Sequence, residues 1–153
     1  QYVREPKPLG TIGSILLVDR FHYEDIIVMN SDLLTNVDFA EFFTFYKKSN
    51  ADMAVAAVPY HVDVPYAVLE TSEDNLVVSL KEKPRYTYFS NAGIYLIKKE
   101  LLDMIPKNQF FDITDLMERI VEMNLKLVTW LDIGKHEDFK KAQEDIRFIK
   151  LWV

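Results

Sequence analysis

The chain has 153 residues, of which 49% are hydrophobic and 27% are charged, and it carries a net charge of −6 without any cysteine. This composition fits one globular domain and excludes a disordered chain, disulfide bonds and thiolate metal sites. The acidic balance argues against a general nucleic-acid-binding protein, since contacts to phosphates need a basic face. With no apolar run long enough to cross a membrane and no signal-peptide pattern, the sequence predicts a cytoplasmic protein that binds neither nucleic acid nor membrane.

The first part of the chain alternates between helical and strand patterns. Residues 11–21 predict a short helix. Residues 25–30 contain a continuous apolar run, Ile-Ile-Val-Met, which predicts a strand buried on both faces, as in a parallel sheet. Asp38 is expected to cap a helix over residues 38–49 with aromatic side chains on one face. Residues 52–60 predict a second buried strand.

The rest of the chain predicts an inserted strand pair and then further alternation of strands and helices. Turn-forming residues at 72–75 separate the two inserted strands. The predicted elements after residue 60 are strands at 66–71, 76–81, 88–97 and 125–133 and helices at 99–105, 112–124 and 136–150. The helix that begins near residue 112 is capped by Asp112 or Thr114. This order predicts an α/β fold with a mostly parallel mixed sheet, in a single domain over residues 1–153.

Two aspartates stand at the ends of predicted strands and are the first candidates for a binding site. Asp32 comes after the apolar run and the turn residues Asn30 and Ser31, and Asp132 follows the segment Leu-Val-Thr-Trp-Leu. Ligands of open α/β sheets bind at the carboxyl ends of the strands, and two carboxylates at one edge suit Mg²⁺. The alternative for each aspartate on its own is a turn or a helix cap.

Three further segments suit a ligand and also have a plain structural explanation. Glu82 and Lys83 stand at a strand end, where a carboxylate can bind sugar hydroxyls and an ammonium can bind phosphate; a solvated strand end explains them too. Gly93 permits close approach of a ligand, with Asn91 as donor and acceptor, or it marks a β-bulge. The turn at residues 8–13 offers backbone amides to an anion, although it lacks a phosphate-loop pattern.

Seven segments taken together give a more specific indication. Between Pro8 and Ile146 they read, in order, PLGTIGS, IIVMNSDLLTN, PYAVLE, LKEKP, SNAGIYLI, FFDITDLMERI and WLDIGKHEDFKKAQ. This order resembles the sugar-1-phosphate nucleotidylyltransferases, which include glucose-1-phosphate thymidylyl- and uridylyltransferases and mannose-1-phosphate guanylyltransferases. The resemblance implies a Rossmann-like αβα sandwich. It also implies a Mg²⁺-dependent reaction of a sugar 1-phosphate with a nucleoside triphosphate, which gives pyrophosphate and a nucleotide sugar for bacterial surface polysaccharide.

The resemblance also implies a role for each matching residue. Asp32 and Asp132 would hold Mg²⁺ and, together with Lys83, would form the catalytic set. The partners would be a nucleoside triphosphate and a sugar 1-phosphate, and a homo-oligomer is left open. The residues implied in substrate binding are Gly10 and Thr11 for the nucleotide base and ribose, Glu82 for sugar hydroxyls, Lys83 for the sugar phosphate, and Tyr66, Ala67, Asn91 and Gly93 for the sugar pocket.

The sequence also departs from the family pattern. Ser31 and Ala67 stand where the family usually has glycine. The signature GGxGTRLxPxTxxxPK, which grips the triphosphate, is absent, so we expect a domain that is incomplete at its N-terminus and a chain that is inactive alone. Thr129 directly precedes Trp130 where the family has several more residues, so we expect that these two residues are not neighbours in the native gene.

Two other functions are alternatives to the nucleotidyltransferase. One is a non-catalytic relative that binds a nucleotide sugar or regulates a partner, and the other is a glycosyltransferase of similar fold. The Glu-Lys-Pro and Asn-Ala-Gly motifs favour the nucleotidyltransferase, because glycosyltransferases more often carry an Asp-x-Asp pair. An upstream GGxGTR segment would favour catalysis over binding alone.

Overall fold

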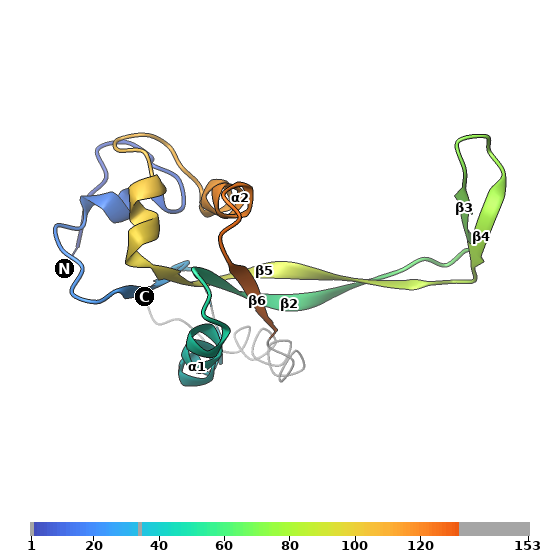
Figure 1. Ribbon diagram of the computed structural model, residues 1–153, viewed down its shortest axis with the longest axis horizontal. Helices are drawn as coiled ribbons and strands as arrows, with labels where there is room; N and C mark the ends of the chain where they lie inside the picture. Colours follow the sequence, from blue (N-terminus) through green and yellow to red (C-terminus); the bar gives the residue numbers. More distant parts are fainter. Residues whose placement is uncertain (1, 34, 132–153) are drawn as a thin grey trace, which may run out of the picture.

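The computed structural model describes residues 2–33 and 35–131 and shows a sheet with helices on both faces (Figure 1). The order across the four-stranded sheet is β1 (Asp25–Met29), β5 (Arg85–Lys98), β2 (Met53–Asp63) and β6 (Leu127–Leu131). β1, β2 and β6 run in one direction, and β5 runs against them. The α/β class and the mixed sheet are therefore confirmed. Most strands share one direction as predicted, but only β2 and β6 pair in parallel, because β5 separates β1 from β2.

The helices form a layer on each side of the sheet. α1 (Phe39–Ser49) lies on one face, and α2 (Ile113–Glu122) lies on the other with two 3-10 segments, η1 (Gly13–Leu17) and η2 (Lys99–Met104) (Figure 1). Both 3-10 segments lie within stretches predicted as longer helices. No helix within the described part of the chain is long and apolar enough to span a membrane.

Aspartates begin both α-helices. The Asp38 carboxylate accepts hydrogen bonds from two backbone amides in the first turn of α1, both at 2.9 Å, so the predicted cap is confirmed. At α2 the cap is Asp112 and not Thr114, because Asp112 forms a capping box in which its amide donates to Asp115 Oδ2 at 2.9 Å. The local pattern thus predicted where α1 begins and left two candidates at α2, between which the structure decides.

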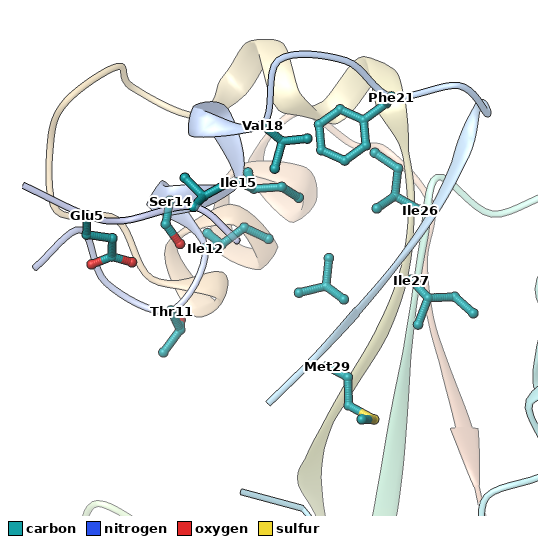
Figure 2. A pocket seen from close by; sticks show the side chains of 12 residues that line it. Glu5, Thr11, Ile12, Ser14, Ile15, Val18, Phe21, Ile26, Ile27 and Met29 are labelled. Atoms are coloured by element: carbon teal, nitrogen blue, oxygen red, sulfur yellow. The ribbon is translucent and has the colours of Figure 1, made fainter. Parts of the chain in front are cut away.

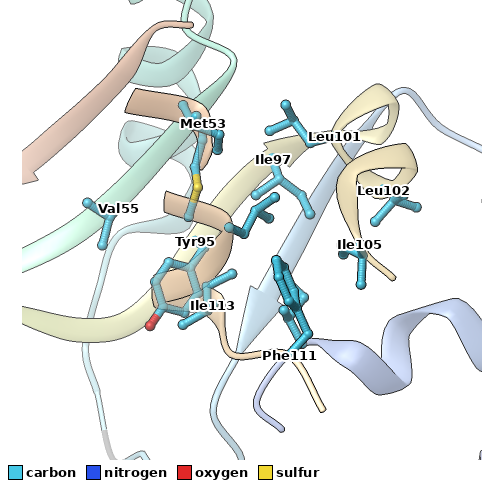
Figure 3. Packing of buried hydrophobic residues seen from close by; sticks show 12 residues of the cluster. Met53, Val55, Tyr95, Ile97, Leu101, Leu102, Ile105, Phe111 and Ile113 are labelled. Atoms are coloured by element: carbon cyan, nitrogen blue, oxygen red, sulfur yellow. The ribbon is translucent and has the colours of Figure 1, made fainter. Parts of the chain in front are cut away.

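The core lies on both faces of the central strands. Met53 and Val55 of β2 pack with α2 and the 3-10 segments, in the cluster shown in Figure 3. Ala54 faces the opposite side, where Phe42 of α1 packs against Trp130 of β6 with ring centroids 5.2 Å apart. This alternation follows from the period of two in a strand. It produces the three layers that the αβα prediction requires.

Within the described residues β1 is an edge strand, and there it is not buried on both faces as predicted. Ile27 and Met29 keep 50% and 47% of their surface exposed, and among the described residues β1 pairs only with β5. A continuous apolar run does not reveal this, because it does not show whether a strand has one neighbour or two. A groove of about 390 Å³ lies beside β1, and its lining includes Val18, Phe21 and Ile26 (Figure 2).

β2 and β5 continue beyond the sheet as a two-stranded arm. The arm extends from Ala57, which lies opposite Asn91, to Asp63, and it carries the hairpin of β3 (Val68–Thr71) and β4 (Val77–Lys81) at its far end (Figure 1). The predicted strand pair is therefore confirmed. Large apolar side chains that are more than half exposed on the arm and hairpin are Tyr60, Tyr66, Leu69, Leu76, Val77, Val78, Leu80, Tyr88 and Phe89.

β5 bulges where the arm leaves the sheet. Val55 lies opposite Tyr95, whereas Ala57 lies opposite Asn91, so two steps along β2 correspond to four steps along β5. Extra residues on one strand of an antiparallel pair bend that strand and change its direction. The bulge that was one explanation of the Asn-Ala-Gly motif is confirmed, and Gly93 lies within it.

Thr129 and Trp130 are successive residues of β6. Thr129 lies opposite Val55, and Trp130 lies opposite Ala56, in an uninterrupted parallel ladder. The strand is thus continuous across these two residues, and the expectation that further residues separate them in the native gene stays a prediction. The short spacing before the Trp-Leu-Asp-Ile-Gly motif is a feature of this chain.

Asp52 joins three strands at the end of the sheet opposite the arm. Its carboxylate accepts from Lys98 Nζ at 2.6 Å and from the Lys126 amide at 2.8 Å. The Lys98 hydrogen bond, followed by the Lys126 amide, lowers the pKa of Asp52 below the usual carboxyl range. A lowered pKa stabilises the folded state above the unfolded carboxyl pKa, and this stability is lost as the pH falls through the folded pKa.

We expect Asp52→Asn to lower the free energy of unfolding by about 1–2 kcal/mol near neutral pH, because it removes a charged hydrogen-bond partner. Urea unfolding of both proteins at about pH 7 and about pH 3 measures the difference. The difference should shrink in acid, where the wild-type carboxylate also becomes neutral. A difference of the same size at both pH values would contradict this explanation.

Candidate active site at the carboxyl edge of the sheet

Asp32 lies in the exposed loop that follows β1. The loop begins at Asn30, whose amide donates to Gly93 O at 3.0 Å, and so it is joined to β5 at its first residue. Asn30, Ser31 and Asp32 are all exposed. None of the ion pairs within residues 2–33 and 35–131 includes Asp32. The structure therefore places this carboxylate where a ligand can reach it.

β6 leads the chain toward the same edge of the sheet. It runs parallel to β2 and in the direction of β1, and its last residue, Leu131, lies opposite Ala57. Asp132 comes next but lies outside the described residues, as does the predicted helix at 136–150. β1 and β6 are the outer strands, so their axes are about 14 Å apart at three strand spacings. A metal held by both aspartates therefore requires the two loops to converge across β5 and β2, at the point where the arm leaves the sheet.

The residues at this edge suit a hard cation in their chemistry. Mg²⁺ binds to one or two carboxylates and completes its shell with water and substrate phosphates. The Asp32 carboxylate, on an exposed loop, has oxygens of the kind that this ion binds. Among residues 2–33 and 35–131 no group of three or more acidic or histidine side chains forms a closed metal site. An open site with few protein ligands is the arrangement expected when a substrate brings further ligands.

Gly10 and Thr11 fasten the N-terminal turn to α2. The Thr11 amide and hydroxyl both donate to Asp112 Oδ1, at 2.9 and 3.2 Å, and the Ile113 amide donates to Thr11 Oγ1 at 2.8 Å. Gly10 has a φ of 78°, and a Cβ there would lie 2.5 Å from Phe111 O. Sequence reasoning missed this connection, because the partners are about a hundred residues apart. Contact of Gly10 and Thr11 with a nucleotide stays a prediction.

The four candidates for the sugar end lie beyond the far end of the arm. Tyr66, Ala67, Glu82 and Lys83 are all exposed there. Lys83 adopts a left-handed φ of 43°, an unusual conformation for a residue with a side chain.

The structure does not bring these four residues together with Asp32. Asn91 and Arg85 are six residues apart along β5, which corresponds to about 20 Å of extended strand. The candidates therefore form three groups: Asp32, Asn91 and Gly93 at the sheet edge; Gly10 and Thr11 beside α2; and Tyr66, Ala67, Glu82 and Lys83 beyond the arm.

The fold and these motifs belong to a known class of protein. Residues 1–148 match the family described as Nucleotidyl transferase, and the chain is a member of that family. The family resemblance and the fold class predicted from the sequence are thus confirmed.

Individual relatives are sugar-phosphate enzymes. The chain is 27% identical to a mannose-1-phosphate guanylyltransferase of Mycobacterium tuberculosis, over 95% of this chain and 44% of that protein. It is 26% identical to a UTP–glucose-1-phosphate uridylyltransferase of Synechocystis, over 89% of this chain and 39% of that protein. Among solved structures, HddC from Yersinia pseudotuberculosis is similar with a TM-score of 0.59 and 26% identity, over 93% of this chain and 64% of that one. The chain thus spans less than half the length of these two curated relatives.

Proposed function

We propose that the protein joins a sugar 1-phosphate to a nucleoside triphosphate and releases pyrophosphate. The observation that carries this proposal is the position of Asp32, an exposed carboxylate in the loop after β1, at the edge of the sheet toward which β6 runs. Membership of the nucleotidyl transferase family supports the same reaction. Because the chain covers less than half of the curated relatives, we propose the activity for the whole protein.

Asp32 and Asp132 are the proposed ligands of Mg²⁺. When bound, the ion would neutralise negative charge on the nucleotide phosphates. In this reaction the sugar phosphate attacks the α-phosphorus in line with the departing pyrophosphate, so the protein mainly positions the reactants and no protein nucleophile is needed. A cytoplasmic location is part of the proposal, because nucleoside triphosphates are abundant there. Use of the product for surface polysaccharide stays a prediction.

The residues beyond the arm are the proposed site for the sugar phosphate. The Glu82 carboxylate accepts hydrogen bonds from sugar hydroxyls, and the Lys83 ammonium pairs with the phosphate. Tyr66 and Ala67 lie at the same end of the arm and would complete the pocket. Because about 20 Å of strand separates this end from the sheet edge, the arm must approach Asp32 in the substrate complex.

The direct experiment is an assay of the whole protein with four nucleoside triphosphates and a panel of sugar 1-phosphates. Pyrophosphate release that requires both substrates and Mg²⁺ is the expected result. Binding of a nucleotide sugar without turnover of any pair would instead support a non-catalytic relative. Transfer of a sugar from a nucleotide sugar to an acceptor would support a glycosyltransferase.

We expect Glu82→Gln to raise the KM for the sugar 1-phosphate about ten- to a hundredfold, because it weakens a charged hydrogen bond to the sugar. The KM for the nucleoside triphosphate should stay nearly unchanged. Glu73→Gln is the matched control, since Glu73 is an exposed glutamate in the turn between β3 and β4. If Glu82→Gln raised the KM for the nucleoside triphosphate instead, the assignment of this end of the arm to the sugar would be wrong.

A further inference from the structure

The bulge in β5 contacts the loop that carries Asp32. The Asn30 amide donates to Gly93 O at 3.0 Å, so the pairing of β1 with β5 extends one residue past Met29. Gly93 is buried and has a φ of 73°. A Cβ on Gly93 would lie 2.7 Å from Asn30 Nδ2 and 3.2 Å from Leu33 Cδ1. A side chain at residue 93 would therefore push the side chains of Asn30 and Leu33 out of their present positions.

Asn91 stabilises the same bulge from within β5. Its Oδ1 accepts a hydrogen bond from the Gly93 amide at 2.8 Å. A bulge leaves an amide without a partner in the strand ladder, and a buried amide without a partner is destabilising. The Asn91 side chain therefore supplies the bond that the ladder lacks. This role differs from the contact with a sugar that the family resemblance implies for Asn91.

The conformation of Gly93 also determines the direction of its carbonyl. Residues with side chains rarely adopt a φ near 73°, and alanine there is strained by about 1–2 kcal/mol even without a collision. In this conformation the carbonyl oxygen meets the Asn30 amide, two residues before Asp32. The hydrogen bond from Asn30 to Gly93, and the packing of the Asn30 side chain against Gly93, thus hold the first residue of the segment 30–32, whose last residue is Asp32.

We propose that the bulge formed by Asn91 and Gly93 is the device that positions Asp32 at the carboxyl edge of the sheet. This inference rests on the proposed function for the metal that Asp32 would bind. Asn91 and Gly93 act as positioning residues, because Gly93 contacts the loop and Asn91 bonds the Gly93 amide, whereas Asp32 would contact the ion. A metal ligand needs such support, since an error of about 1 Å in its position is enough to weaken a site.

Nuclear magnetic resonance of the protein tests the proposal without measuring activity. Amide hydrogen exchange reports the bond from Asn30 to Gly93, and broadening of the Asp32 amide resonance by substoichiometric Mn²⁺ reports the metal. We expect Gly93→Ala to speed exchange of the Asn30 amide about tenfold and to weaken the Mn²⁺ effect at Asp32. Gly10→Ala is the matched control, because Gly10 also has a positive φ and no room for a Cβ, but it contacts Phe111 and Asp112. It should change neither signal.

A second variant covers the case in which Gly93→Ala does not fold. Asn91→Ala removes the acceptor for the Gly93 amide without introducing a collision, and it should also speed exchange of the Asn30 amide. Asn91→Asp keeps an oxygen at this position and should restore the protection that Asn91→Ala loses.

The results separate this inference from the proposed function. Unchanged exchange at Asn30 in both Gly93→Ala and Asn91→Ala would overturn it. Faster exchange with an unchanged Mn²⁺ effect at Asp32 would also overturn it, because the bulge would then stabilise the fold without positioning the ligand. If Asp32→Asn itself leaves Mn²⁺ broadening of the loop unchanged, the metal assignment of the proposed function fails. The exchange of Asn30 then still decides whether the bulge positions the loop.

Discussion

Replacing Asp32 by asparagine should lower the rate of pyrophosphate release by the whole protein about two to four orders of magnitude at saturating substrates. The change keeps the size and shape of the side chain and removes the full negative charge that would hold Mg²⁺. Asp32 is exposed and forms no ion pair with the described residues, so its loss should not lower the stability of the fold. A fall in rate with an unchanged urea midpoint is therefore the expected pair of results.

Asp103→Asn is the matched control for this experiment. Asp103 is an exposed aspartate in η2, which follows β5 at the end of the sheet opposite the arm, and its change should leave the rate unaltered. The assay is repeated over a range of Mg²⁺ concentrations. Activity of Asp32→Asn equal to that of the wild-type protein at limiting Mg²⁺ would refute the assignment of Asp32 as a metal ligand.

Replacing Leu96 by alanine should lower the free energy of unfolding by about 2–5 kcal/mol, because it opens a cavity in the centre of the sheet. Leu96 has 0% exposure and pairs with Ile27 on one side and Ala54 on the other. Its side chain belongs to the cluster that contains Phe42 and Trp130. Urea unfolding followed by circular dichroism measures the effect.

Leu80→Ala provides the comparison, because it makes the same chemical change at a position in β4 that is 60% exposed. Its effect should stay within about 0.5 kcal/mol, since little apolar surface leaves water at this position. Similar losses for the two variants would mean that the hairpin is buried in solution, either against another part of the protein or against a second copy.

Local sequence patterns predicted the central part of the fold well. The continuous apolar run of β2 places Met53 and Val55 on one face and Ala54 on the other, and all three are buried. Asp38 and Asp112 were identified as candidate caps because aspartate satisfies the free amides of a first helical turn. The apolar run of β1 does not predict how far that strand is buried, because the number of neighbours of a strand depends on the order of strands in the sheet. That order is not a local property.

In the candidate site, too, local patterns predicted some features, whereas contacts between distant segments could not be predicted. The position of Asp32 after an apolar strand followed from the order of residues along the chain. The bond between Thr11 and Asp112, and the fit of Gly93 against Asn30, arise between segments far apart in sequence. No periodicity encodes such contacts; the available signals were a glycine inside a strand and a polar turn before a helix. Asp132 lies outside the described residues, so its predicted role stays a prediction.

The exposed arm has a consequence for how tightly a substrate can bind. Glu82 and Lys83 lie beyond a two-stranded ribbon whose apolar side chains, such as Tyr60 and Tyr88, are more than half exposed. A segment with so few buried contacts is expected to fluctuate more than the sheet core. If a sugar phosphate binds there as proposed, ordering the arm carries an entropic cost that lowers the affinity, and a rigid scaffold would not impose this cost. Substitutions that stiffen the arm away from the ligand should therefore tighten binding, so affinity in this protein can change without any change in the residues that contact the sugar.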